Sequence, residues 1–219
     1  RSKMKNTRSS LLAIASLAIL GCSSLKLESE YKDPDRVLFH ANKLLVVGIT
    51  PDMAVREDFE TRLREVFSGE GIETVRSIDL FDVAFTQTPQ TEEELDRVEQ
   101  QLLDKDFDAI LLTKVVGTER HTNLAQSLGE IGAAYERFSR DYVVHQDIYF
   151  DKAYYEAPTD YYTETSLYCI CVGKERSLVW RNNILISNPR NPEKAIRDYI
   201  RMISNRMEHN QVLLGTDIF

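Results

Sequence analysis

The chain has 219 residues, with 27 lysines and arginines against 35 aspartates and glutamates, and its formal net charge at pH 7 is −8. An acidic protein repels phosphate groups, so this balance argues against a nucleic-acid partner. The length allows one well-packed domain and does not require two.

A positively charged start and an apolar run open the chain. Basic residues precede the apolar run 11–20, and Gly21 then stands before Cys22. This is the three-part layout of a secretory signal, so we expect residues 1–21 to be a signal peptide. Ten helical residues span about 15 Å, half of the ~30 Å hydrocarbon core, and the run is therefore too short for a permanent transmembrane helix.

The residues Ile19-Leu20-Gly21-Cys22 resemble the lipobox of bacterial lipoproteins, although that family more often has leucine in place of Ile19. The resemblance implies cleavage between Gly21 and Cys22 and attachment of diacylglycerol to the Cys22 sulfur. Two or more acyl chains anchor a protein stably, whereas one binds only marginally. Ser23 is not the aspartate that retains such proteins at the inner membrane of enteric bacteria, which implies the outer membrane, facing the periplasm. An ordinary signal peptide, or a core helix with a chance cysteine, is the alternative.

Residues 22–42 are expected to form the lipid anchor and a tether. They are polar and show no sustained hydrophobic period. An extended chain of this length reaches roughly 70 Å. The folded body, residues 43–219, would then stand clear of the membrane.

Two short strands are predicted at the start of this body. Residues 43–49 are an apolar run rich in branched side chains, typical of a strand buried on both faces. Residues 72–76 alternate between apolar and polar side chains, as a second strand would. A helix between them would make a β-α-β unit, whose right-handed crossover implies parallel strands.

The connecting helix is expected to start at Thr50 as N-cap, with Pro51 as its first helical residue. Apolar residues recur at helical spacing between positions 55 and 67, while Arg56 and Glu60 fall on the polar side. The turn before this helix has no glycine-rich phosphate loop, so we expect no nucleotide cofactor.

A second helix and a third core strand follow. Thr91 and Glu94 form the pattern of a capping box, which marks a helix start. Residues 109–116 are again apolar and branched, typical of a buried strand.

An insertion is expected at about residues 120–160. Apolar residues from Leu124 to Phe138 recur at helical spacing. This segment either packs on the protein's own sheet or docks against a partner or a membrane.

Tyrosines gather in and after this insertion. Eight of the ten lie between positions 135 and 168. Tyr154, Tyr155, Tyr161 and Tyr162 are the candidate partner surface, because tyrosine offers a large contact area with a polar tip. Alternatively, they reflect only the preference of tyrosine for strands.

Two extended runs, 163–172 and 178–187, predict an antiparallel hairpin, and a helix with its buried stripe between Ile196 and Met207 ends the pattern. The predicted fold class is therefore α/β. It has a mixed sheet with a β-α-β-α-β core, followed by the hairpin region and the C-terminal helix, within one domain.

A candidate cleft lies where the first and third core strands end. Thr50 and Asp52 follow the first strand, and Glu119 and His121 follow the third. Open α/β sheets bind ligands at this edge. The sequence nevertheless contains no catalytic motif and no metal-ligand spacing, so neither a metal nor a cofactor is expected. Cys169 and Cys171 are interpreted as buried thiols, with a labile disulfide, or metal or redox chemistry, as the alternatives.

The run Leu44-Leu45-Val46-Val47-Gly48-Ile49-Thr50, the strand at Leu178-Val179-Trp180 and the lipobox make residues 43–208 similar to bacterial envelope lipoproteins. More distantly, this part resembles the α/β module of curli-export lipoproteins and the amino-terminal domain of the periplasmic Tol-system protein. The resemblance implies a membrane-anchored periplasmic protein that binds, scaffolds or assists assembly through contacts with an envelope protein rather than through catalysis. The alternative is a hydrolase-like envelope enzyme using the candidate cleft.

Overall fold

The computed structural model describes residues 24–81, 85, 86, 88–118, 137–150, 160–170 and 177–213. Their strands are β1 (Ser24–Lys32), β2 (Lys43–Ile49), β3 (Glu73–Arg76), β4 (Ala109–Thr118), β5 (Asp160–Cys169) and β6 (Ser177–Ser187). Their helices are α1 (Met53–Gly69), α2 (Ser77–Leu80), α4 (Glu92–Leu103), α6 (Phe138–His145), the 3-10 helix η1 (Gln146–Tyr149) and α7 (Pro192–His209).

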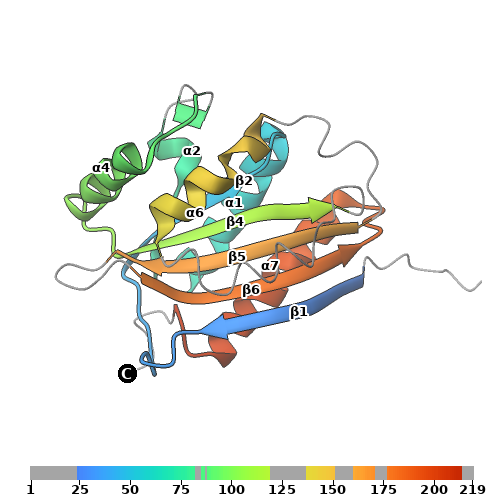
Figure 1. Ribbon diagram of the computed structural model, residues 1–219. Coiled ribbons are helices and arrows are strands. Elements are labelled where there is room, and N and C mark those ends of the chain that lie inside the picture. The colour runs from blue at the N-terminus through green and yellow to red at the C-terminus, as the bar shows by residue number, and fades with distance from the viewer. Residues whose placement is uncertain are drawn as a thin grey trace, which may run out of the picture.

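The described strands form one six-stranded sheet in the order β1-β6-β5-β4-β2-β3 (Figure 1). β2 runs parallel to both β3 and β4, as expected for strands joined through helices. The pairs β4–β5, β5–β6 and β6–β1 are antiparallel. The mixed sheet, the helices between its strands and the C-terminal helix confirm the predicted fold class.

β1 shows that the predicted tether is wrong for residues 24–32. This segment pairs with β6 along its length and forms the edge of the sheet. Leu25 and Leu27 pack against the core while Lys26 and Glu28 form an ion pair beside them, so the segment alternates as an edge strand does. With only two leucines, this alternation is too short to stand out in the sequence.

The residues after β1 are also tied to the folded body. Lys32 Nζ donates to the backbone oxygens of Val37 and Asn210, at 2.8 and 2.5 Å. Phe39 is buried and forms a parallel bridge with Val212. A reach of roughly 70 Å is therefore not available to residues 24–42.

One face of the sheet is covered by α1 and α7 (Figure 1). Phe59 of α1 and Tyr199 of α7 lie against each other, with ring centroids 6.2 Å apart. The predicted stripe of α7 is confirmed, since Tyr199, Ile200, Ile203 and Met207 are all buried. This core continues over the sheet to Trp180 and Ile184 of β6.

The opposite face is covered by α4, α6 and η1. Phe138 and Tyr142 of α6 pack with Leu95 of α4 in this second core. The tyrosine-rich stretch is therefore helical at Tyr142, not extended. The rest of the predicted apolar stripe, before residue 137, lies outside the described residues.

The helix starts agree only in part with the sequence prediction. The capping box of α4 is confirmed, because Thr91 Oγ1 accepts from the Glu94 amide and the Glu94 side chain accepts from the Thr91 amide. The predicted start of α1 is wrong by two residues, since Asp52 is the N-cap. The carboxylate of Asp52 accepts hydrogen bonds from the amides of Ala54 and Val55, in the first turn of the helix. Thr50 therefore is not the residue that caps α1.

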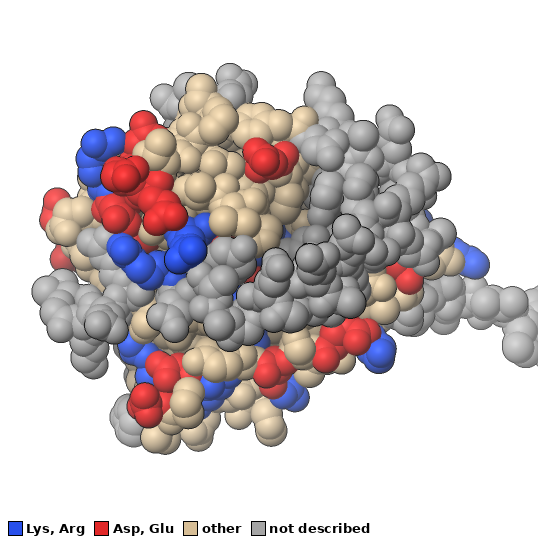
Figure 2. Space-filling view, in the orientation of Figure 1, with Lys and Arg blue, Asp and Glu red and all other residues tan. Residues whose placement is uncertain are grey.

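The surface carries its acids in groups. Figure 2 shows acidic side chains gathered over α4, whose first turn contains Glu92, Glu93 and Glu94. Acids are favourable there because the first turn of a helix carries a partial positive charge. No helix in the described ranges combines the length and the apolar character needed to cross a bilayer.

Candidate functional site

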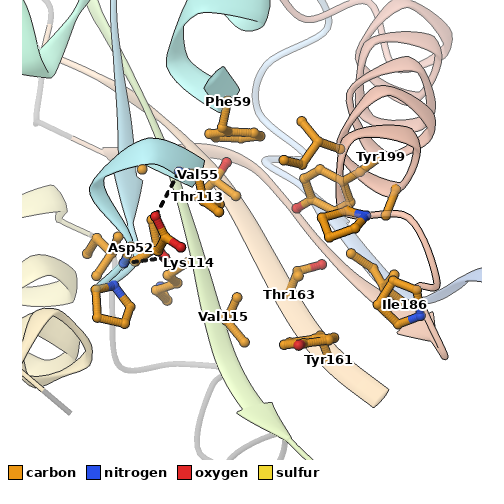
Figure 3. A pocket seen from close by; sticks show the side chains of 18 of the residues that line it. Asp52, Val55, Phe59, Thr113, Lys114, Val115, Tyr161, Thr163, Ile186 and Tyr199 are labelled. Carbon is orange, nitrogen blue, oxygen red and sulfur yellow. Dashed lines mark hydrogen bonds between the residues drawn. The ribbon is translucent and has the colours of Figure 1, made fainter. Parts of the chain in front are cut away.

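A pocket of about 680 Å³ lies at the edge of the sheet where β2 and β6 end and β5 begins. It is bounded by the first turns of α1 and α7 (Figure 3). Its apolar lining residues include Ile49, Met53, Val55, Phe59, Val115, Ile186, Pro189, Ala195 and Ile196. The size lies within the range of about 300–1,000 Å³ that is usual for small-molecule sites.

Hydroxyl groups on the pocket floor are bonded to one another. Thr113 Oγ1 lies 2.8 Å from Thr165 Oγ1, which lies 2.6 Å from the Tyr199 hydroxyl. Thr163 Oγ1 donates to the Ile184 carbonyl oxygen at 2.8 Å. Burial raises the pKa of Tyr199 to about 12, so this floor is uncharged at neutral pH.

Thr50 and Asp52 of the predicted cleft both lie at the rim of this pocket. Asp52 Oδ1 accepts from the amides of Ala54 and Val55, at 2.9 and 3.1 Å, and thereby caps α1. The Asp52 amide donates to Thr50 Oγ1 at 3.3 Å. The other two cleft residues, Glu119 and His121, lie outside the described residues, as do Gly21 and Cys22.

The candidate tyrosine surface is divided by the sheet. Tyr161 lines the pocket, on the face covered by α1 and α7 (Figure 3). Tyr162 follows it directly in β5, and adjacent residues of a strand point to opposite faces. These two side chains therefore do not form one surface, and Tyr154 and Tyr155 lie outside the described residues.

A cluster of buried charges lies on the other face of β4 and β5. Lys114 Nζ bonds Asp141 Oδ1 at 2.5 Å and Glu164 Oε1 at 2.6 Å. The side chains of all three residues are almost completely inaccessible to solvent. Arg181 joins the cluster through its Nε, 3.3 Å from Glu164 Oε1. Two cations and two carboxylates thus neutralise each other.

The environment of Asp141 keeps its carboxylate ionised. Burial raises its pKa, but the charge of Lys114, together with His145 and Arg181, outweighs burial and holds the pKa of Asp141 below its ordinary value. The Tyr168 hydroxyl also donates to Asp141 Oδ2, at 2.5 Å. Because these groups are buried and mutually engaged, the cluster is built to hold helix α6 on the sheet.

The sequence contains one sign of this cluster, which did not enter the predicted site. Lys114 stands within the apolar strand 109–116, where a buried cation requires an anionic partner. Its partners come from separate elements, Asp141 from α6 and Glu164 from β5. The strand alone could therefore indicate that partners exist, without identifying them.

A second buried pair corrects the prediction for α1. Arg56 and Glu60 were expected on the polar side, yet they are 3% and 0% exposed. Arg56 Nε bonds Glu60 Oε1 at 3.0 Å, and the Gly48 amide and Ser77 hydroxyl donate to the same oxygen at 2.9 and 2.7 Å. These bonds fix the first turns of α1 against β2, next to the pocket.

The interpretation of two buried thiols is wrong for Cys169, which is disulfide-bonded. Its sulfur partner lies outside the described residues, as Cys22 and Cys171 both do. Within the described part of the chain, no group of three histidine, cysteine or acidic side chains is arranged to hold a metal ion.

No protein-family model matches the chain, and no curated protein matches it in sequence. Among solved structures, it is similar to a PelC dodecamer from Paraburkholderia phytofirmans, with 10% identity and a TM-score of 0.41 over 87% of this chain and 99% of that chain. It is also similar to lipoprotein GNA1162 from Neisseria meningitidis, with 13% identity and a TM-score of 0.37 over 76% of this chain and 98% of that chain. At these identities and TM-scores, the likeness supports no argument about function.

Proposed function

We propose that this chain is a lipid-anchored, non-catalytic binding protein of the bacterial envelope, and that the pocket between α1 and α7 holds an apolar ligand or an apolar part of an envelope partner. The observation that carries the proposal is the chemistry of the lining. Most side chains around the cavity of about 680 Å³ are apolar. Apolar walls of this kind favour binding through the removal of apolar surface from water.

The engagement of nearby polar groups supports a non-catalytic role. A general acid or base has to reach the substrate and be free to donate or accept a proton. Asp52 caps α1, and the ammonium group of Lys114 is held by two carboxylates on the opposite face of the sheet. Tyr199 keeps its proton up to about pH 12. Each of these groups is engaged elsewhere in the protein: Asp52 with amides of α1, Lys114 with Asp141 and Glu164, and Tyr199 with Thr165.

The envelope location is supported by the predicted signal, with cleavage between Gly21 and Cys22 and lipid on the Cys22 sulfur. Growth with radiolabelled palmitate tests it directly. We expect label on the wild-type protein and none on Cys22→Ala, which should also leave the outer-membrane fraction. Equal labelling of the two proteins would contradict the proposed anchor.

Binding in the pocket is tested with the fluorescent apolar probe N-phenylnaphthylamine. Ala195 is buried in the first turns of α7 and lines the pocket, whereas Ala54 is exposed in the first turn of α1. We expect Ala195→Phe to weaken probe binding by about tenfold, because the added ring fills the cavity, and the matched variant Ala54→Phe to leave it unchanged. Equal affinities for the wild-type protein and Ala195→Phe would contradict the proposal.

The hydrolase-like alternative makes a different prediction. Replacement of Asp52, Glu119 and His121 together, using Asp52→Asn to keep the helix cap, would abolish the cellular role of an enzyme. For the binding protein proposed here, we expect this triple variant to retain its cellular role. In-cell crosslinking of the mature protein would then identify its envelope partner.

A further inference from the structure

We infer that the pocket takes one acyl chain of a phospholipid from the membrane that anchors the protein. This inference rests on the proposed function and specifies its ligand. It follows from where the pocket opens relative to the anchor, and from which groups line it.

The start of β1 and the pocket lie at the same end of the sheet. Ser24 pairs with Ser187, and Leu25 pairs with Ile186. Ile186 lines the pocket, as does Pro189 just beyond the end of β6. Figure 1 shows β1 beginning at the end of the sheet where the arrowheads of β4 and β6 lie.

The predicted anchor allows little distance between this end and the bilayer. Cys22 precedes Ser24 by two residues, which span at most about 7 Å of extended chain. A lipid on Cys22 would therefore hold this end of the sheet against the head-group region. A long tether would have left the orientation free, but residues 24–32 belong to the sheet.

The rim and the interior of the pocket suit an amphipathic lipid. Met53 stands at the rim and is 46% exposed, which gives the rim an apolar side chain toward the membrane. Inside, Val55, Ile196 and Phe59 offer apolar walls. The carboxylate of Asp52 remains at the outer edge, where it disfavours an anionic group entering the cavity. An uncharged hydrocarbon chain fits these apolar walls, whereas a charged head group would stay outside the cavity.

Photolabelling of the lipidated full-length mature protein tests the inference. The protein is reconstituted into vesicles of phosphatidylethanolamine and phosphatidylglycerol that contain a phospholipid with a diazirine near the end of one acyl chain. After irradiation, we expect label on the first turns of α1 and α7, at Val55 and Ile196. Ala195→Phe should reduce this labelling by about tenfold, because its ring occupies the space of the chain, while Ala54→Phe should not change it.

The outcomes separate this inference from the proposed function. Label confined to residues before Leu25, or equal label in the wild-type protein and Ala195→Phe, would overturn the inference. If N-phenylnaphthylamine still bound in an Ala195-dependent manner, the binding pocket would stand and only the acyl-chain assignment would fall. If the wild-type protein did not bind N-phenylnaphthylamine, both the acyl-chain inference and the proposed function would be overturned. Should Ala195→Phe not fold, Val55→Phe fills the cavity from a half-buried position on α1 and is expected to give the same reduction.

Discussion

Strands β4 and β5 have opposite chemistry on their two faces. Toward α6, Lys114 and Glu164 form part of a buried charge cluster. Toward α1 and α7, Thr113 and Thr163 face the pocket with hydroxyl groups that are already bonded. Side chains alternate between the faces at each residue, so one step along a strand separates a dense ionic core from a cavity.

The difference between the two faces shows why the described residues of the pocket floor present hydroxyl groups and no charged group, although the Asp52 carboxylate lies at the rim and the ammonium group of Lys114 is held on the other face. Buried ions are tolerated only when their partners are also buried and well oriented, which requires a filled, closely packed layer. The hydroxyl groups on the pocket side are satisfied by one another and by the Ile184 carbonyl oxygen, so that side can leave volume unfilled. The charge cluster stabilises the sheet, and the pocket is left with neutral walls that suit an apolar ligand.

The largest expected effect comes from removing the cation of the charge cluster. Lys114→Met keeps the aliphatic stem but leaves Asp141 and Glu164 without their shared partner. Breaking a buried ion pair costs about 3–5 kcal/mol, and we expect this loss in the free energy of unfolding, measured with urea. The control Lys194→Met removes a partly exposed pair with Asp198 and should cost less than about 1 kcal/mol. Similar losses for the two variants would show that the cluster does not stabilise the fold.

A smaller effect is expected on the pocket side at alkaline pH. The pKa of Tyr199 is raised from 10.0 to about 12, so between these values the unfolded chain loses this proton while the folded protein keeps it. Stability is therefore complete below about pH 10 and falls as the pH rises, by up to about 1.4 kcal/mol per pH unit for one such group. Tyr199→Phe should remove this contribution and reduce the slope.

At neutral pH, the same variant should lose about 1 kcal/mol, because the hydroxyl bond to Thr165 disappears. Urea unfolding at pH 7, 10, 11 and 12 gives both quantities. If the pH dependence of the unfolding free energy were the same in Tyr199→Phe and the wild-type protein, the Tyr199 hydroxyl of the wild-type protein would be exposed to water.

The smallest effects are expected at the rim. Asp52→Ala removes the N-cap of α1 and should cost about 1 kcal/mol in unfolding free energy, whereas Asp52→Asn keeps an acceptor and should stay within a few tenths. Neither change removes apolar lining, so we expect Asp52→Asn to bind N-phenylnaphthylamine like the wild-type protein. Weaker binding by Asp52→Asn would mean that the charge of Asp52 contributes to recognition.

Local patterns in the sequence predicted most of the fold. The capping box at Thr91 and the stripe of α7 need only neighbouring residues, and both are confirmed. The strand at residues 24–32 was missed because its partner β6 is distant in sequence. Local alternation over a few residues does not indicate whether a strand has a partner.

The candidate site was predictable only in part. Its rim, at Thr50 and Asp52, follows from the rule that ligands bind where parallel strands end. Its walls were missed because α1 and α7 meet only in three dimensions, as Phe59 and Tyr199 do. The charge cluster was missed for the same reason, since Lys114 lies 27 and 50 positions in the sequence from its two acidic partners.

The pairing of β1 with β6 has a consequence for how the chain reaches its final state. Glu30 bonds Arg206, which is 176 positions later in the sequence. Contacts of such large sequence separation form slowly, because closing the long intervening loop costs conformational entropy. In a protein that crosses a membrane N-terminus first, the edge strand would emerge early and wait for nearly the whole polypeptide before it could pair. Folding would then be completed only after translocation, and an unpaired strand of this kind is a natural target for a holding chaperone.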